Sequence, residues 1–280
     1  ASSSAMRKLD LRTPIIYLLT VVIVLLLVII KRMGGPAEKP GTAAKETIEE
    51  SSAVTAPIRV KGKIGLIIDD FGYRNDEISD GFLHLDVNLT CAVIPGHAYS
   101  STFGEKAVSR GHEVIVHMPM ENVGENRGEE EFVLRVDMKP DAVKNRVYDA
   151  LDQIPEAIGM NNHQGSQATA DPGVMNSVAA VLKERNKFFI DSRTTPETVA
   201  ESIMNNWKVP SARRNVFLDN DHDEEKITRQ LLSLVEIAER DGSAIGIGHV
   251  KQNTLNVLRK QIPELKRKGF KFEFVSNMLY

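Results

Sequence analysis

Short apolar runs alternate with amphipathic stretches along most of the chain. The apolar runs predict strands at 64–68, 89–94, 113–117, 157–161, 187–190, 216–218, 244–248 and 271–275. The amphipathic stretches predict helices at 76–85, 101–110, 140–153, 172–185, 196–207, 224–240 and 254–268. Because strands and helices alternate strictly, we expect parallel strands joined by right-handed crossovers. Eight strands within residues 61–280 favour an α/β fold, a distorted (β/α) barrel of seven or eight parallel strands, over an open doubly wound sheet.

The N-terminal residues have a different pattern. Residues 13–30 are uncharged and mostly apolar, and a helix of this length, at ~1.5 Å per residue, spans roughly the ~30 Å core of a bilayer. Basic residues are slightly more numerous before this stretch than after it, which favours a cytoplasmic N-terminus. We predict a cytoplasmic segment at 1–12 and a transmembrane anchor or signal segment at 13–32.

An uncleaved anchor is favoured over a signal peptide, because no small residues suited to a signal peptidase end the apolar stretch. Residues 33–60 are rich in Gly, Pro, Ala, Lys, Glu, Ser and Thr without an apolar period, which predicts a disordered linker. The N-terminal helix would tether the chain to a bacterial inner membrane as a single span, with the barrel domain at 61–280 in the periplasm or outside the cell.

Composition narrows the chemistry. The net charge of -3 and the lack of a basic stripe predict no nucleic-acid partner. Cys91 is the only cysteine, so the chain has neither a disulfide framework nor a thiolate cage for zinc. Any metal must therefore bind to histidine and carboxylate side chains.

Polar residues follow most of the predicted strands, and a barrel would bring them to one mouth. In chain order they are Asp69, Asp70, His117, Glu121, Asn161, Asn162, His163, Ser166, Asp191, Ser192, Arg193, Asp219, Asn220, Asp221 and His249. Among them we predict substrate contacts by Asn162, Ser166, Asp191, Arg193 and Asp219.

Asp69 and Asp70 are predicted to have different roles, because successive side chains leave a strand on opposite sides. One carboxylate can bind a cation while its neighbour takes a proton from the cation's water. The alternative is that the pair merely caps the following turn.

Three histidines are candidates for the same site. His117 and Glu121 are two potential ligands four residues apart, and they suit a hydrolytic divalent cation. His163 lies in a polar turn, where it either binds metal or holds the turn by hydrogen bonds. His249 ends an apolar strand, and its near-neutral pKa suits it to protonate a leaving group. Capping of the next helix is the alternative for His249.

Taken together, these motifs resemble the polysaccharide deacetylase superfamily, and more closely its divergent bacterial branch, over roughly residues 63–280. The run Ile-Ile-Asp-Asp at 67–70 resembles the first motif of the superfamily. The resemblance implies that Asp69 is the catalytic base and Asp70 a metal ligand. It also implies a barrel fold, a divalent metal cofactor such as zinc, and a glycan substrate.

Two further motifs extend the resemblance. The segment 111–121 is similar to the second motif, with His117 at the first metal-binding position and Glu121 where the superfamily has a second histidine. The segment 245–249 is similar to the last motif and implies that His249 is the general acid.

The departures from the superfamily pattern keep alternatives open. A carboxylate at Glu121 favours harder cations, so the metal is zinc or another divalent cation. The candidate ligands are Asp70, His117, Glu121 and His163, with His163 as the alternative that completes the coordination shell instead of Glu121. The Arg-Pro motif of the superfamily is absent, which leaves Arg193 or Asp191 to orient the base.

Two functions follow. The first is an envelope-facing, metal-dependent hydrolase that removes an acyl group from a glycan. The second is a catalytically inactive glycan-binding or scaffold protein that retains the barrel. Aromatic residues that could stack on sugars are few and scattered along the chain, namely Trp207, Tyr73, Tyr99 and Tyr148. This sparseness counts against a strong lectin and predicts a narrow or short substrate contact. The sequence identifies neither the sugar nor any protein partner.

Overall fold

The computed structural model describes residues 22–23, 60–124 and 131–280. The chain divides into two units, Ala1–Val54 and Thr55–Tyr280. In the first unit the described residues, 22 and 23, are helical. The rest of the predicted segments 1–12 and 13–32, and nearly all of 33–60, lie outside the described residues. Among the residues that are described, no helix is both long and apolar enough to span a bilayer.

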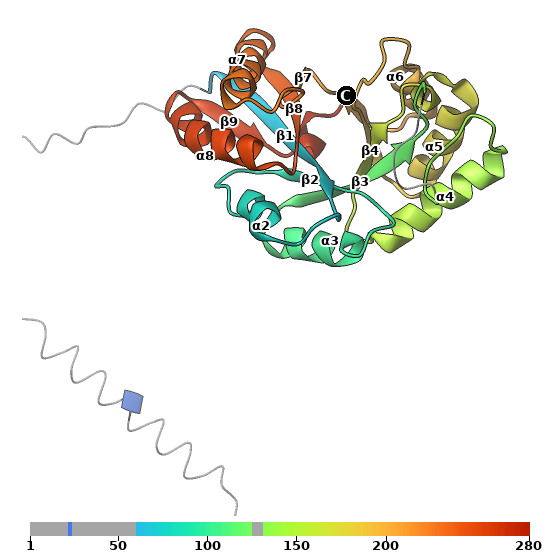
Figure 1. Ribbon diagram of the computed structural model, residues 1–280, viewed down its shortest axis with the longest axis horizontal. Coiled ribbons are helices and arrows are strands. Elements are labelled where there is room, and N and C mark those ends of the chain that lie inside the picture. The colour runs from blue at the N-terminus through green and yellow to red at the C-terminus, as the bar shows by residue number, and fades with distance from the viewer. Residues whose placement is uncertain (1–21, 24–59, 125–130) are drawn as a thin grey trace, which may run out of the picture. The chain divides into compact units, whose positions relative to one another are not determined.

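The second unit is built on one sheet of parallel strands (Figure 1). The strands are β1 (Gly62–Phe71), β2 (Thr90–Val93), β3 (Glu113–Met120), β4 (Gly159–Gln164), β5 (Phe188–Asp191), β6 (Ser211–Arg213), β7 (Val216–Phe217), β8 (Ser243–His249) and β9 (Phe270–Glu273). Their order is β6-β5-β4-β3-β2-β1-β8-β7, and β9 also pairs with β1. This α/β half-barrel of parallel strands fits the distorted (β/α) barrel predicted from the sequence.

Helices surround the sheet on its outer side (Figure 1). They are α2 (Glu77–Leu83), α3 (Ser100–Ser109), α4 (Pro140–Gln153), α5 (Pro172–Glu184), α6 (Ala200–Trp207), α7 (Glu224–Asp241) and α8 (Gln252–Arg267), with short 3-10 turns at Ala168–Ala170 and Val275–Met278. Aspartates begin three of them, because the side chains of Asp76, Asp171 and Asp223 accept hydrogen bonds from backbone N–H groups of the first turn. Gly242, at a positive φ, ends α7.

The strands are buried on both faces. On one face, Ile64, Leu66 and Ile68 of β1 belong to a large apolar cluster shared with the helices. On the other face, Ile67 belongs to a smaller cluster that contains one or two side chains from several strands, such as Ile115 of β3. This smaller cluster, the inner cluster, fills the inside of the half-barrel. Side chains on the same face but nearer the carboxyl ends of the strands lie at the open end of the half-barrel, which we call the mouth.

Several strand ends differ from the prediction. β3 continues to Met120 instead of ending at 117, and β4 runs to Gln164 instead of ending at 161. Asn162 and His163 therefore lie in a strand, and the turn begins at Gln164 and Gly165, which both have positive φ. β6 was not predicted because its three residues contain no apolar run.

Candidate active site

Four polar side chains continue the inner face of the half-barrel beyond its apolar cluster. Asp69, His117 and His249 each lie two residues after an isoleucine of the inner cluster. Residues two apart share a face of a strand, so these side chains point to the mouth. Asn161 joins them because β4 pairs it with His117. Asp69, His117 and Asn161 are at most 2% exposed.

Asp70 breaks the alternation of β1. Its φ is 70°, in the left-handed region that residues other than glycine rarely adopt. Asp70 Oδ1 lies 3.4 Å from His117 Nε2 and 3.4 Å from His163 Nδ1. Asp69 Oδ2 is 3.6 Å from the same nitrogen, His117 Nε2. With Asp70 in the left-handed conformation, both carboxylates therefore approach the imidazole of His117. We expected the side chains of Asp69 and Asp70 to leave opposite sides of the strand, but the structure places both carboxylates at the mouth.

The residues Asp70, His117 and His163 fit a divalent cation. They offer one ligand atom each within 4.8 Å of one another. Asp70 Oδ1 is buried and accepts no hydrogen bond in the part of the chain that the structure describes. His117 Nδ1 donates to Asn161 Oδ1, so Nε2 of a neutral His117 ring carries a lone pair toward Asp70. Two imidazoles and one carboxylate form a donor set typical of catalytic zinc sites.

Electrostatics in the metal-free protein point the same way. Burial disfavours the charge on Asp70, yet the imidazoles of His117 and His163 outweigh it and hold the pKa of Asp70 below its usual range. Burial also opposes the charge on His117, but Asp69 and Asp70 raise the pKa of His117 to about 9. In the metal-free protein, the two carboxylates thus favour a positive charge beside them, and a proton on His117 supplies it.

Glu121 lies outside this group of ligand atoms. Its Oε2 accepts a hydrogen bond of 2.7 Å from the backbone N–H of Val136. Because β3 continues to Met120, His117 and Glu121 are separated by about 13 Å of extended chain. The structure therefore groups His163, and not Glu121, with Asp70 and His117.

Asn161, which received no role in the sequence analysis, connects the metal group to Asp69. Its Oδ1 accepts from His117 Nδ1 at 2.8 Å and its Nδ2 donates to Asp69 Oδ1 at 2.9 Å. One amide thereby fixes both the tautomer of His117 and the orientation of Asp69. The expectation that Arg193 or Asp191 orients the base is corrected, because Asn161 makes this contact. The signal was present in the alternation of β4, which places Asn161 and not Asn162 on the inner face.

Asn161 holds one oxygen of Asp69, and the other, Oδ2, lies 3.6 Å from His117 Nε2. Burial raises the pKa of Asp69 above its ordinary value, and the imidazoles of His117 and His249 act in the opposite direction. A carboxylate with a raised pKa is suited to proton transfer near neutral pH.

His249 is held by Asp219. The Nδ1 of His249 donates to Asp219 Oδ1 at 2.7 Å, and the other oxygen of Asp219 accepts from the His249 backbone N–H and from Thr254. Burial opposes the charge on His249, but the hydrogen bond and charge of Asp219 raise its pKa. The Asp219 side chain is 0% exposed, so its position favours orienting His249 over direct contact with a substrate.

The other predicted substrate contacts support the loops at the mouth. Asn162 Oδ1 accepts from the Ser192 backbone N–H at 2.8 Å. Ser166 donates to Asn122 at 2.6 Å, and buried Asp191 accepts from the Arg193 backbone N–H at 2.7 Å. Their direct contact with substrate stays a prediction.

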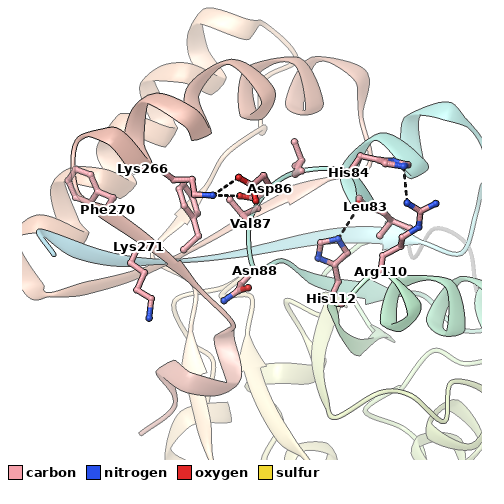
Figure 2. A pocket seen from close by; sticks show the side chains of 13 residues that line it. Leu83, His84, Asp86, Val87, Asn88, Arg110, His112, Lys266, Phe270 and Lys271 are labelled. Atoms are coloured by element: carbon pink, nitrogen blue, oxygen red, sulfur yellow. Dashed lines mark hydrogen bonds and ion pairs between the residues drawn. The ribbon is translucent and has the colours of Figure 1, made fainter. Parts of the chain in front are cut away.

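A cavity of about 700 Å³ lies at the opposite end of the sheet (Figure 2). It is lined by residues that precede β2 and β3 and by the start of β9, and by none of the predicted site residues. Its cations already have partners, since Lys266 Nζ lies 2.7 Å from Asp86 Oδ2 and Arg110 lies 3.0 Å from His84. This cavity is therefore not the candidate active site, although it is large.

A half-barrel with acidic, imidazole and amide side chains gathered at the carboxyl ends of its strands has its polar groups where (β/α)-barrel proteins place their functional sites. A family model described as divergent polysaccharide deacetylase matches residues 66–279. The chain belongs to this family.

Two relatives and one solved structure are similar to this chain. An uncharacterized protein of Haemophilus influenzae is 36% identical over 227 residues, which are 80% of each chain. The Escherichia coli protein YibQ, also uncharacterized, is 33% identical over 213 residues, 76% of this chain and 66% of that one. The crystal structure of uncharacterized protein ATU2773 from Agrobacterium tumefaciens is similar with a TM-score of 0.73 at 21% identity, over 80% of this chain and 91% of that one. The latter likeness shows the fold.

Proposed function

We propose that the protein is a metal-dependent hydrolase that removes an acyl group from a glycan. The observation that carries the proposal is the convergence of Asp70, His117 and His163 on one point beside Asp69, with His249 at the same mouth. Membership of the divergent polysaccharide deacetylase family supports a glycan as the substrate class.

The chemistry follows from the side chains. Asp70, His117 and His163 would hold the cation, zinc or another divalent metal. When bound, such a cation supplies Lewis-acid polarisation of the acyl oxygen and of water. Asp69, held by Asn161, takes a proton from the attacking water, and His249, whose pKa Asp219 raises, donates a proton to the leaving nitrogen. The two proton-transfer groups come from neighbouring strands, because β1 pairs Asp69 with His249.

Metal analysis of the purified full chain, paired with acyl release from a panel of N-acetylated glycans, tests this proposal. We expect about one bound cation, release of acetate, and loss of release after chelation or in Asp69→Asn. The proposal fails if the wild type and Asp69→Asn are equally inactive across the panel while a cation is bound.

We further propose that the barrel faces the cell envelope, tethered to the inner membrane by residues 13–32. The uncharged stretch 13–30 and its basic flanks support this placement. Protease treatment of spheroplasts tests it. Digestion of the barrel without lysis is the expected result, and full protection until lysis contradicts the proposal.

A further inference from the structure

Two exposed tyrosines stand in neighbouring loops beside the candidate active site. Four aromatic side chains are among the large exposed ones of the described residues, and they are Tyr73 (41%), Tyr99 (40%), Trp207 (40%) and Tyr280 (60%). Tyr73 follows β1 and Tyr99 follows β2, and these two strands are paired. The fold thus brings together two tyrosines that are 26 residues apart in the sequence.

The two loops are fastened to each other. The backbone N–H of Tyr99 donates to Gly72 O at 3.3 Å, and that of Ile94 donates to Phe71 O at 2.8 Å. Buried Ser100 donates to Ile94 O at 2.6 Å. Gly72, with φ of 109°, permits this approach, since a Cβ there would lie 2.9 Å from Ile94 O. The exposed tyrosines therefore stand on a backbone that is already ordered, so a ligand need not pay for ordering it.

Two of the aromatic side chains contact each other near the candidate metal ligands, and Tyr99 is attached to the same loop by its backbone hydrogen bond to Gly72. The rings of Tyr73 and His97 have centroids 4.1 Å apart with planes at 50°. Tyr73 is three residues after Asp70, so their Cα atoms are separated by at most about 11 Å. We call Tyr73, His97 and Tyr99 the aromatic rim. It lies within reach of a short oligosaccharide that has one sugar at Asp70.

We infer that the aromatic rim binds the pyranose ring next to the sugar that reacts. This inference rests on the proposed function. One face of a pyranose is made of C–H groups, and burying it against an aromatic ring removes apolar surface from water while the hydroxyl groups stay solvated. Tyrosine supplies such a surface at low cost in side-chain entropy, because it has few rotatable bonds. The bound glycan then spans at least two sugars and extends across the loops that follow β1 and β2.

Chain-length dependence of hydrolysis tests the inference. With the metal-loaded full chain, kcat/KM is measured on the monomer, dimer and tetramer of N-acetylglucosamine. We expect Tyr73→Ala and Tyr99→Ala to lower kcat/KM on the tetramer about three- to tenfold each and to leave the value on the monomer unchanged. Tyr73→Phe should retain most activity, since the ring remains. Trp207→Ala, an equally exposed aromatic residue on α6, is the control and should have no effect. Equal losses at every chain length, or none in either tyrosine variant, overturn the inference.

A binding arm separates this inference from the proposed reaction. Titration of the tetramer into the Asp69→Asn protein, followed by NMR or calorimetry, needs no turnover. We expect the further change Tyr73→Ala to weaken tetramer binding by a similar factor. If the wild type hydrolyses no glycan but this weakening is found, the aromatic rim stands and the hydrolase proposal fails. Unchanged binding in Tyr73→Ala overturns the rim even if hydrolysis is found.

Discussion

Polar side chains are buried and in mutual contact at one end of the sheet, whereas at the other end they are exposed. At the mouth, Asp69, His117 and Asn161 are at most 2% exposed and contact one another. At the other end, the paired side chains of Lys266 and Asp86 are 42% and 97% exposed beside a large cavity (Figure 2). Burying polar groups costs free energy unless they are paired, whereas exposed ion pairs contribute little. Convergence of buried polar groups therefore identifies the candidate site better than cavity volume does.

The backbone differs between the two ends as well. Asp70, Gln164 and Arg193, at or just after the ends of β1, β4 and β5, have positive φ values of 70°, 54° and 48°. Such residues cost about 1–3 kcal/mol each and cluster at functional sites. Among the described residues, the other non-glycine residues with positive φ are Asn186, two residues after the end of α5, and Lys208, the residue after α6. That conformation is common at helix ends, so only the mouth concentrates it at strand ends.

The largest effect should come from the base at the mouth. Asp69→Asn keeps the size of the side chain but cannot take a proton, so we expect kcat to fall about 10²–10⁴-fold with the cation retained. Asp86→Asn, at the cavity end, is the matched control and should keep wild-type kcat. Steady-state acetate release and metal analysis measure both variants. If Asp69→Asn and Asp86→Asn had equal kcat values, the two ends of the sheet would not differ in function as we infer.

Loss of a metal ligand should have the next largest effect. We expect His117→Ala to remain folded and to lose the cation, because the variant removes one of three converging ligand atoms. Glu121→Gln should bind the cation as the wild type does, since its carboxylate hydrogen-bonds to Val136. Elemental analysis and circular dichroism provide the measurements. Full occupancy in His117→Ala would reassign the ligands to Asp70, Glu121 and His163.

Substitution of Asn161 should change both metal binding by His117 and proton transfer by Asp69. Asn161→Leu removes the contacts to His117 and Asp69, so we expect a 10- to 100-fold loss in metal affinity or activity. Asn161→Asp keeps an acceptor for His117 but sets an oxygen against Asp69, so kcat should fall more than metal affinity. Asn176→Leu, on the surface of α5, is the control. Identical losses of metal and kcat in the two Asn161 variants would contradict the bridging role.

Some residues of the candidate site can be located from the sequence pattern alone and others cannot. The position of Asp70 and His117 at the mouth was predictable, because each stands at the end of an apolar run that predicts a buried strand. Asn161 was missed because its role depends on which face of β4 is inward, and the neighbouring Asn162 offers the same chemistry. Glu121 was grouped with His117 because the run was expected to end at 117, whereas β3 continues to Met120.

The fold was predicted more completely than the site. Alternation of apolar and amphipathic stretches requires only local periodicity, so nearly every long helix was expected at its place. The site depends on contacts between residues far apart in the chain, such as Asp219 with His249. The left-handed φ of Asp70 is likewise set by the packing around the mouth, and an aspartate at a strand end does not reveal it.

Metal affinity should rise with pH at the mouth. The pKa of His117 in the metal-free protein is raised to about 9, so a cation must displace a proton below that pH. We expect apparent zinc affinity to increase about tenfold per pH unit from pH 7 and to level off near pH 9. Competition with a chelating dye measures it, and a flat profile contradicts it. In the metal-free protein, the stability that this proton contributes is fully present below about pH 6.5 and is lost as pH rises through about 9.

The smallest effects should come from the cavity end. Lys266→Ala breaks the exposed pair with Asp86 and should change the free energy of unfolding by less than about 1 kcal/mol. The value of kcat/KM should stay unchanged, because the pair lies at the opposite end of the strands from Asp69. Chemical denaturation and the acetate-release assay measure the two quantities. A loss of activity as large as that of Asn161→Leu would mean that this cavity takes part in function, and the contrast between the two ends would then be wrong.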